Sequence, residues 1–175
     1  MLGRLLGQKG IPDFVQVAQR IRLRRPEARF LLAGEEDFVH PDAISAEWVN
    51  QQNGVEYLGR LADVRPLLAQ ADVLLFPSYR EGVPRVVMEA AATGLPTVGF
   101  DVPGVREAVR HGQTGYLVSD RDVDALTQKV ELLLDNPTRR LEMGQEARNL
   151  AEKAFDIRVI QAQYLEIYRE LGVEI

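Results

Sequence analysis

Short apolar runs alternate with helix-like segments along most of this 175-residue sequence, and this alternation constrains the fold more than any other feature. The runs are continuously apolar, a pattern typical of parallel strands that are covered on both faces. Segments between them carry apolar residues at helical spacing. The sequence therefore predicts an α/β fold with a doubly wound parallel sheet of five or six strands. The clearest predicted strands span residues 29–34, 55–59, 72–78, 96–101 and 114–118.

Composition narrows the class of protein. Hydrophobic residues make up 46% of the chain and charged residues 27%, which fits a globular domain and not a disordered one. A formal net charge of −5 argues against a nucleic-acid-binding protein. The absence of cysteine excludes disulfides and thiol chemistry. We predict a cytoplasmic protein, because the sequence shows neither a signal peptide nor an apolar run that could span a bilayer.

Ligands of Rossmann-like sheets bind beyond the carboxyl ends of the strands, and the stretch "SYREGVPRVVMEAAATG" (78–94) comes after one such end. It contains a loop carboxylate, Glu81, and a second carboxylate, Glu89, within an otherwise apolar helix. Glu89 has a purely structural interpretation as the partner of Arg85, one helical turn earlier. Glu81 has one as a solvated loop residue. The alternative is that both carboxylates face a ligand.

The beginning of this helix is suited to an anion. It comprises Gly82, Val83, Pro84 and Arg85. Gly82 allows the backbone to approach a ligand closely, and the free N–H groups of the helix start attract negative charge. Glu81 could then orient sugar hydroxyls, while Glu89 could accept hydrogen bonds from a ribose. Backbone amides that suit a phosphate therefore lie between two carboxylates that suit sugar hydroxyls. This combination predicts a nucleotide-sugar site.

The chain resembles the retaining GT-B glycosyltransferases of family 4 in several ordered segments. The Glu-x7-Glu region of that family is similar to "EGVPRVVMEAAATGLPTVGFDVPGVREAV", and "HGQTGYLV" matches the family's next segment. Its phosphate-binding turn is similar to "GRLLGQKGI". The stretch "VEYLGRLADVRPLLAQADVLLFPSYREGVPR" is more similar still to members that build bacterial surface polysaccharides on lipid-diphosphate carriers. Because the resemblance covers nearly the whole chain in order, it implies one half of a GT-B fold.

The resemblance also implies roles for individual residues. Glu81 would contact hydroxyls of the donor sugar and Glu89 the nucleotide ribose. Arg4 and Lys9 would neutralise the diphosphate leaving group, since fixed cations stabilise the negative charge that develops on a departing oxygen. The alternative interpretations are a solubilising loop for Arg4 and Lys9 and a surface charge for Arg85.

The sequence offers little for a metal or an organic cofactor. His40 and His111 are its only histidines and share no ligand spacing, so we predict no metal site. The dinucleotide fingerprint Gly-x-Gly-x-x-Gly is missing, and we expect no cofactor. One turn departs from the family pattern: Pro103-Gly104 stands where two glycines are more common. Proline lacks an N–H, so we do not expect a phosphate contact at residue 103.

We predict a single donor-binding domain over residues 1–175, with a C-terminal helix at about 157–172. The sequence begins inside what should be its first strand, and we expect the N-terminal acceptor domain of a GT-B enzyme to be missing from it. The last helix should leave part of an apolar face exposed. That face comprises Phe155, Val159, Tyr164, Ile167 and Tyr168. We expect Trp48 in the core.

Two classes of function remain open. In the first, the full protein transfers a hexosyl or N-acetylhexosaminyl group, with retention, from a nucleotide-diphosphate sugar to a lipid-linked or glycan acceptor. The resemblance favours UDP as the nucleotide and a peripheral position at the inner face of the plasma membrane. The isolated chain should bind the donor and transfer nothing. In the second class, the chain is a non-catalytic module for nucleotide-sugar binding or protein interaction.

Overall fold

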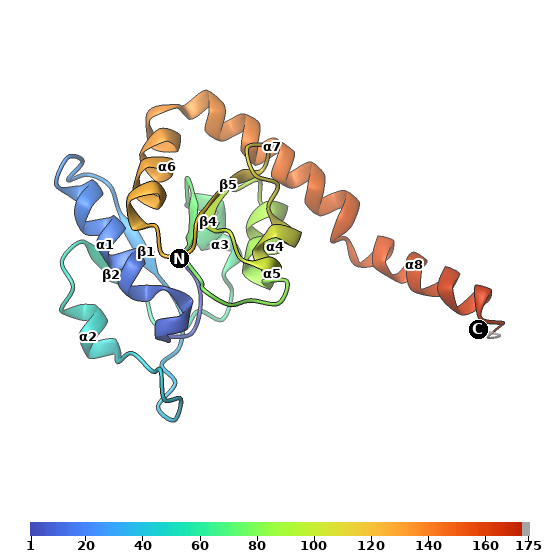
Figure 1. The fold of residues 1–175 in the computed structure, drawn as a ribbon, viewed down its shortest axis with the longest axis horizontal. Helices are drawn as coiled ribbons and strands as arrows, with labels where there is room; N and C mark the ends of the chain where they lie inside the picture. The colour runs from blue at the N-terminus through green and yellow to red at the C-terminus, as the bar shows by residue number, and fades with distance from the viewer. Residues whose placement is uncertain (173–175) are drawn as a thin grey trace.

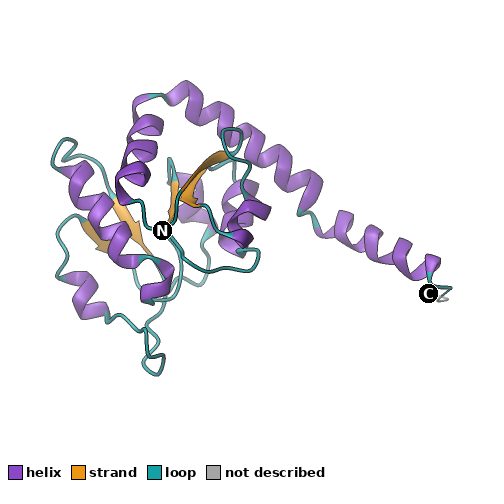
Figure 2. Cartoon of the chain, in the orientation of Figure 1, coloured by secondary structure: helices purple, strands orange, loops and turns teal. Residues whose placement is uncertain are grey.

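A computed structural model describes residues 1–172 and confirms the predicted α/β architecture. Figure 2 shows the strands at the centre of the molecule with helices on both sides. In chain order, the elements are η1 (Gly7–Lys9), α1 (Ile11–Arg22), β1 (Phe30–Leu32), α2 (Ala46–Asn50), β2 (Val55–Tyr57), α3 (Arg65–Gln70), β3 (Leu74–Phe76), α4 (Arg85–Ala92), β4 (Thr97–Phe100), α5 (Pro103–Ala108), β5 (Gly115–Val118), α6 (Val123–Asp135), α7 (Pro137–Ala154) and α8 (Ile157–Glu170). The five clearest predicted strands and the C-terminal helix are therefore present with somewhat different ends, but the strand expected at the very start of the chain is not.

All strand pairings between these elements are parallel, but they form two hydrogen-bonded groups where the sequence predicted one sheet. One group is β1–β2 and the other is β3–β4–β5. The segment before η1 lies beside β1: the N–H of Gly3 donates to the carbonyl of Ala33 at 3.0 Å, and that of Leu5 to Glu35 at 2.9 Å. It forms only isolated bridges, because the chain turns tightly between Arg4 and Leu6 and then enters η1.

The helices bury the faces that their sequences predict. On α1, Phe14, Val17, Ala18 and Ile21 are all buried, and Pro12 occupies the first turn, where a missing N–H costs nothing. On α4, Val87, Ala90 and Ala91 are buried. In the chain as a whole, α1 packs against α6, and α4 packs against α7. These pairings hold α1 and α4 against helices from the C-terminal part of the chain.

Helix α8 projects away from the rest of the molecule (Figure 1). Its bounds agree with the predicted helix, and its apolar face is open as expected: Tyr164, Ile167 and Tyr168 are exposed, while Phe155 and Val159 beside the α7–α8 junction are partly buried. The prediction for Trp48 is wrong. It lies on the short helix α2, which buries only Val49, and Trp48 remains 37% exposed.

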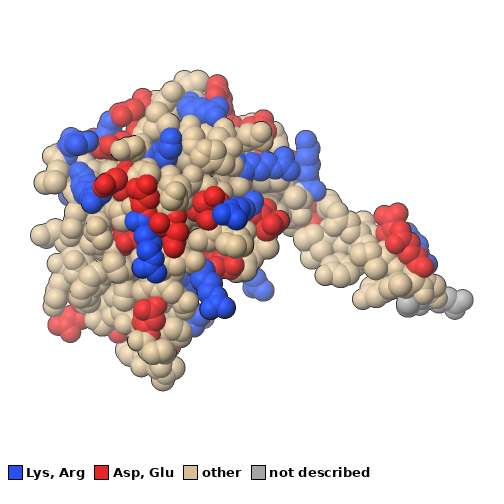
Figure 3. Space-filling model, in the orientation of Figure 1, with Lys and Arg blue, Asp and Glu red and all other residues tan. Residues whose placement is uncertain are grey.

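The outer surface carries positive and negative side chains side by side. Figure 3 shows Lys and Arg side chains interspersed with Asp and Glu over the face in view. Of the helices within residues 1–172, none is long and apolar enough to cross a membrane.

Candidate functional site

The carboxyl ends of the strands bring together two residues that the sequence assigned to different tasks. Lys9 closes η1, and Glu81 lies in the loop between β3 and α4. The Lys9 Nζ lies 2.7 Å from Glu81 Oε1, and their side chains are 21% and 11% exposed. At this degree of burial the attraction is stronger than at an open surface. Each charge is therefore neutralised by the other.

The backbone around this ion pair is tied together on two sides. The N–H of Tyr79 donates to the carbonyl of Gln8 at 3.0 Å, which joins the Glu81 loop to the Lys9 turn. On the other side Gly104, in the first turn of α5, packs against the same loop. A Cβ at Gly104 would lie 1.7 Å from the carbonyl oxygen of Gly82 and 2.4 Å from that of Glu81. The protein therefore requires a glycine at 104 for packing, a role that the sequence did not reveal.

Arg4 lies on the same turn as Lys9 but has a different partner. Its NH1 donates to Asp37 Oδ2 at 2.7 Å, and its side chain is 51% exposed while that of Asp37 is 15% exposed. Asp37 comes after β1, so the loop after a neighbouring strand holds Arg4. The structure thus keeps Arg4 at the carboxyl edge, in an ion pair that the sequence did not predict.

The start of α4 is open. Pro84 is its N-cap and offers no side-chain cap, so the first N–H groups of the helix receive no hydrogen bond from a capping side chain. A Cβ at Gly82 would meet no atom within 4 Å, so protein packing does not require this glycine. Val83 is 48% exposed, and Arg85 begins the helix at the surface. The first amides of α4 therefore have no side-chain cap, and Gly82, Val83 and Arg85 around them are exposed, while the predicted anion site stays a prediction.

Glu89 lies on the exposed side of α4, opposite its buried alanines and valine. Within residues 1–172 it forms no ion pair, so the structure does not show the proposed pairing with Arg85. It opens onto a groove of about 400 Å³ between α4 and the α7–α8 junction. The lining residues are Arg85, Met88, Glu89, Ala92, Arg148, Ala151, Glu152, Phe155 and Asp156. Glu89 is thus free to accept hydrogen bonds from a ligand.

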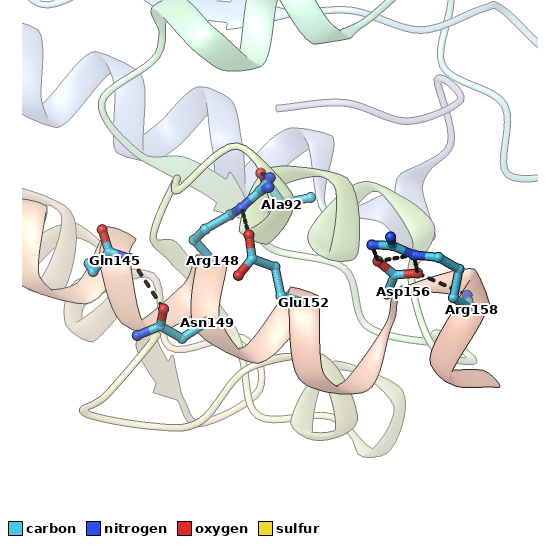
Figure 4. A network of polar contacts seen from close by, with 7 residues as sticks. All are labelled: Ala92, Gln145, Arg148, Asn149, Glu152, Asp156 and Arg158. Atoms are coloured by element: carbon cyan, nitrogen blue, oxygen red, sulfur yellow. Dashed lines mark hydrogen bonds and ion pairs between the residues drawn. The ribbon is translucent and has the colours of Figure 1, made fainter. Parts of the chain in front are cut away.

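The far wall of this groove is formed by ion pairs along α7 and at the start of α8 (Figure 4). Arg148 Nε donates to Glu152 Oε1 at 2.7 Å, and the same guanidinium donates to the carbonyl of Ala92 on α4. Beyond them, Arg158 lowers the pKa of Asp156 to about 2 through hydrogen bonds to its carboxylate. Sequence reasoning missed this wall, because it lies more than fifty residues after Glu89 and carries no local motif.

A second polar cluster lies beneath the Glu81 loop. The hydroxyl of Tyr79 donates to Asp13 Oδ2 at 2.7 Å, and Arg121 Cζ lies 4.4 Å from the centroid of the Tyr79 ring. Burial raises the pKa of Asp13, although the Tyr79 hydrogen bond and the Arg121 charge oppose the rise. Burial also raises the pKa of Tyr79, and the hydrogen bond from its hydroxyl to Asp13 raises this pKa further. Sequence reasoning missed this cluster too, since its members come from three distant segments.

Other features of the chain lie apart from this edge. A cavity of about 460 Å³ is lined by residues 27–31 and 70–75, which lie at the amino ends of β1 and β3. Ligands of such sheets bind at the opposite ends, so the cavity is a poor candidate for the site. In the part of the chain that the structure describes, no group of three or more His, Asp or Glu side chains could hold a metal ion.

Comparison with known proteins places these features in a family context. The family described as Glycosyl transferases group 1 matches residues 1–136. The chain is 34% identical over 170 residues to N,N'-diacetylbacillosaminyl-diphospho-undecaprenol alpha-1,3-N-acetylgalactosaminyltransferase of Campylobacter jejuni, covering 96% of this chain and 43% of that protein. It is 32% identical over 164 residues to N-acetyl-alpha-D-glucosaminyl L-malate synthase of Bacillus anthracis, covering 93% and 42%.

Solved structures give the same result. Sucrose-phosphate synthase from Thermosynechococcus elongatus superposes with a TM-score of 0.84 at 29% identity, over 98% of this chain and 45% of that one. HepE from Anabaena, in complex with UDP, superposes with a TM-score of 0.85 at 25% identity, over 97% and 47%. The chain therefore spans less than half the length of these relatives.

Proposed function

The chain belongs to the glycosyl transferases group 1 family, and from this premise we propose that it is the donor-binding half of a retaining GT-B enzyme. One observation carries the proposal. The Lys9–Glu81 ion pair and the uncapped start of α4 lie at the same edge of the sheet, and the free carboxylate of Glu89 lies one turn further along the helix. Lys9 and the uncapped amides of α4 suit the diphosphate of a nucleotide-diphosphate sugar, Glu81 suits its sugar, and Glu89 suits its ribose.

In the proposed complex each group has one task. The diphosphate lies against the first amides of α4, with Lys9 and Arg4 supplying positive charge to the leaving group. Glu81 accepts hydrogen bonds from the donor sugar, and Glu89 accepts them from the ribose. Gly82 leaves room for the ligand, because nothing in the protein fills the space where a side chain would stand.

Donor binding would redistribute charge at the ion pair. Lys9 is held by Glu81, so an arriving diphosphate competes with that carboxylate for the ammonium group. Glu81 is then released to accept hydrogen bonds from the sugar. No metal ion is needed in this scheme, because protein cations and helix amides stabilise the departing phosphate oxygen.

We propose a hexosyl or N-acetylhexosaminyl donor, with UDP as the nucleotide, and a lipid-linked or glycan acceptor. Support for the donor comes from the UDP in the HepE structure, and support for the acceptor from the diphospho-undecaprenol in the Campylobacter relative's name. The full protein would then act at the inner face of the plasma membrane. Because acceptor positioning and water exclusion require a second cleft wall, this chain alone should bind donor without transferring the sugar.

Calorimetry of the chain with UDP, UDP-glucose and UDP-N-acetylglucosamine tests the proposal. We expect saturable binding of at least one of them, unchanged by excess EDTA. GDP and ADP serve as controls for the base. A chain that binds none of these nucleotides while remaining folded would contradict the proposed function, and loss of binding in EDTA would contradict the metal-free scheme.

A further inference from the structure

Tyr79 lies where three distant segments of the chain meet. Its hydroxyl donates to Asp13 in the first turn of α1, at 2.7 Å. Its ring stacks on Phe100 at the end of β4, with centroids 5.8 Å apart and planes 21° apart. The guanidinium of Arg121, from the loop between β5 and α6, lies 4.4 Å from the centroid of the same ring. Tyr79 therefore joins segments from α1 to α6 through one side chain.

The backbone of Arg121 is unusual. Its φ is 63°, and it is the single non-glycine residue with a positive φ among residues 1–172. The next residue, Asp122, caps α6 by accepting a hydrogen bond from the N–H of Ala125. An L-residue with a long side chain seldom adopts this conformation, which favours glycine or asparagine. The contact between Arg121 and the Tyr79 ring is an interaction that neither glycine nor asparagine could make.

Tyr79 is also linked to both partners of the ion pair at the site. Its N–H is bonded to the carbonyl of Gln8, the residue before Lys9. Two residues beyond Tyr79 comes Glu81, whose carboxylate meets Lys9 at 2.7 Å. A shift of the Tyr79 backbone would therefore move Lys9 and Glu81 relative to each other.

We propose that Asp13, Tyr79 and Arg121 form a positioning unit that sets the geometry of Lys9 toward the diphosphate and of Glu81 toward the donor sugar. None of the three is assigned a direct contact with the nucleotide, so they act through the residues that they hold. The inference rests on the proposed function and deepens it. If Tyr79 were only a packing residue, its ring alone would matter, and the hydroxyl and Arg121 would be dispensable.

Three variants separate these interpretations. Tyr79→Phe keeps the ring and removes the hydroxyl. Arg121→Gln removes the cation from a side chain that is 69% exposed, so the fold should survive, and Arg121→Lys restores a cation. Arg29→Gln is the control, since Arg29 is also 69% exposed and pairs with Glu56 away from the site.

The first measurement is calorimetric and compares UDP with UDP-glucose. We expect Tyr79→Phe and Arg121→Gln to weaken UDP-glucose binding about fivefold more than UDP binding, because both ligands meet Lys9 through the diphosphate whereas only UDP-glucose meets Glu81. Arg121→Lys should recover most of the loss, and Arg29→Gln should show none. Equal losses for both ligands, or no loss, would overturn the positioning unit.

The second measurement needs no ligand. Hydrogen exchange of the Tyr79 amide should accelerate about fivefold or more in Tyr79→Phe and in Arg121→Gln, because its bond to Gln8 is loosened. If the wild-type chain binds no nucleotide, the proposed function fails while this measurement still decides the inference. Wild-type exchange at residue 79 in both variants would refute the positioning unit whatever the chain binds.

Discussion

Glu81 and Glu89 belong to one motif, yet the structure places them in contrasting surroundings. Glu81 is mostly buried, paired with Lys9 and enclosed by a backbone that packs against Gly104. Glu89 is exposed, faces a groove and has no ion-pair partner in the described chain. The contrast teaches that contacts within the protein hold one half of the motif in shape, whereas the other half is left open to solvent.

The largest expected effect concerns the tight packing of Gly104 against the loop that carries Glu81. Gly104→Val should lower the free energy of unfolding by about 3 kcal/mol, because its Cβ would strike the carbonyl oxygens of Gly82 and Glu81. Gly82→Ala is the matched control, with an expected change within about 0.5 kcal/mol, since its Cβ meets nothing. Urea unfolding measures both. Similar values for the two variants would show that the loop yields to α5 and is not closed.

The open side is tested by binding. Glu89→Ala should weaken UDP binding by roughly 1–3 kcal/mol, the range for hydrogen bonds to a charged group, while the melting temperature changes little. Glu152→Ala, on the opposite wall of the groove, is a useful control that removes a carboxylate already paired with Arg148. A sharp fall in melting temperature with unchanged affinity would make Glu89 a structural residue and remove the contrast.

A smaller effect on stability should distinguish Glu81 from Glu89. Glu81→Gln should lower the free energy of unfolding by about 1 kcal/mol, because it leaves the half-buried Lys9 without its counter-charge. A double-mutant cycle with Lys9→Met should give a coupling of similar size. The exposed pair Arg29–Glu56 is the comparison, with a coupling of only about 0.3 kcal/mol expected. Equal couplings in the two cycles would place Glu81 in a solvent-like environment.

The smallest effect concerns pH. Burial raises the pKa of Asp13 above its ordinary 3.8, with Asp120 adding to the rise and Tyr79 and Arg121 opposing it. Between the ordinary pKa of Asp13 in the unfolded chain and its raised pKa in the folded protein, the folded state binds more protons than the unfolded state. The free energy of unfolding therefore falls as pH rises through this window. Asp13→Asn keeps an acceptor for Tyr79 and cannot ionise, so its stability relative to wild type should increase with pH there. Urea unfolding from about pH 3.5 to about pH 7 measures this, and a constant difference would argue against the shifted pKa.

Sequence patterns predicted the elements of the fold well, because strand and helix periodicity are local properties. They also predicted that the last helix has an open face, whereas for Glu89 they left both an ion pair with Arg85 and a ligand-facing role open. They did not predict that Lys9 and Glu81 pair, since 72 residues separate them, or that Arg4 binds Asp37. The division of the strands into two groups was also missed, because a continuous apolar run does not reveal where a hydrogen-bonded ladder is interrupted.

The contact between Lys9 and Glu81 also has a consequence for the order of events during synthesis. The ribosome adds about 5–20 residues each second, so the 72 residues between them take roughly 4 to 14 s to make. The β1–β2 pair can form within that interval, since both strands precede Glu81 in the chain, whereas α1 still lacks α6, the helix against which it packs. Until Glu81 has been added, the turn that carries Lys9 lacks the carboxylate that neutralises it. The proposed donor site can therefore close only after the β1–β2 side of the domain has been synthesised.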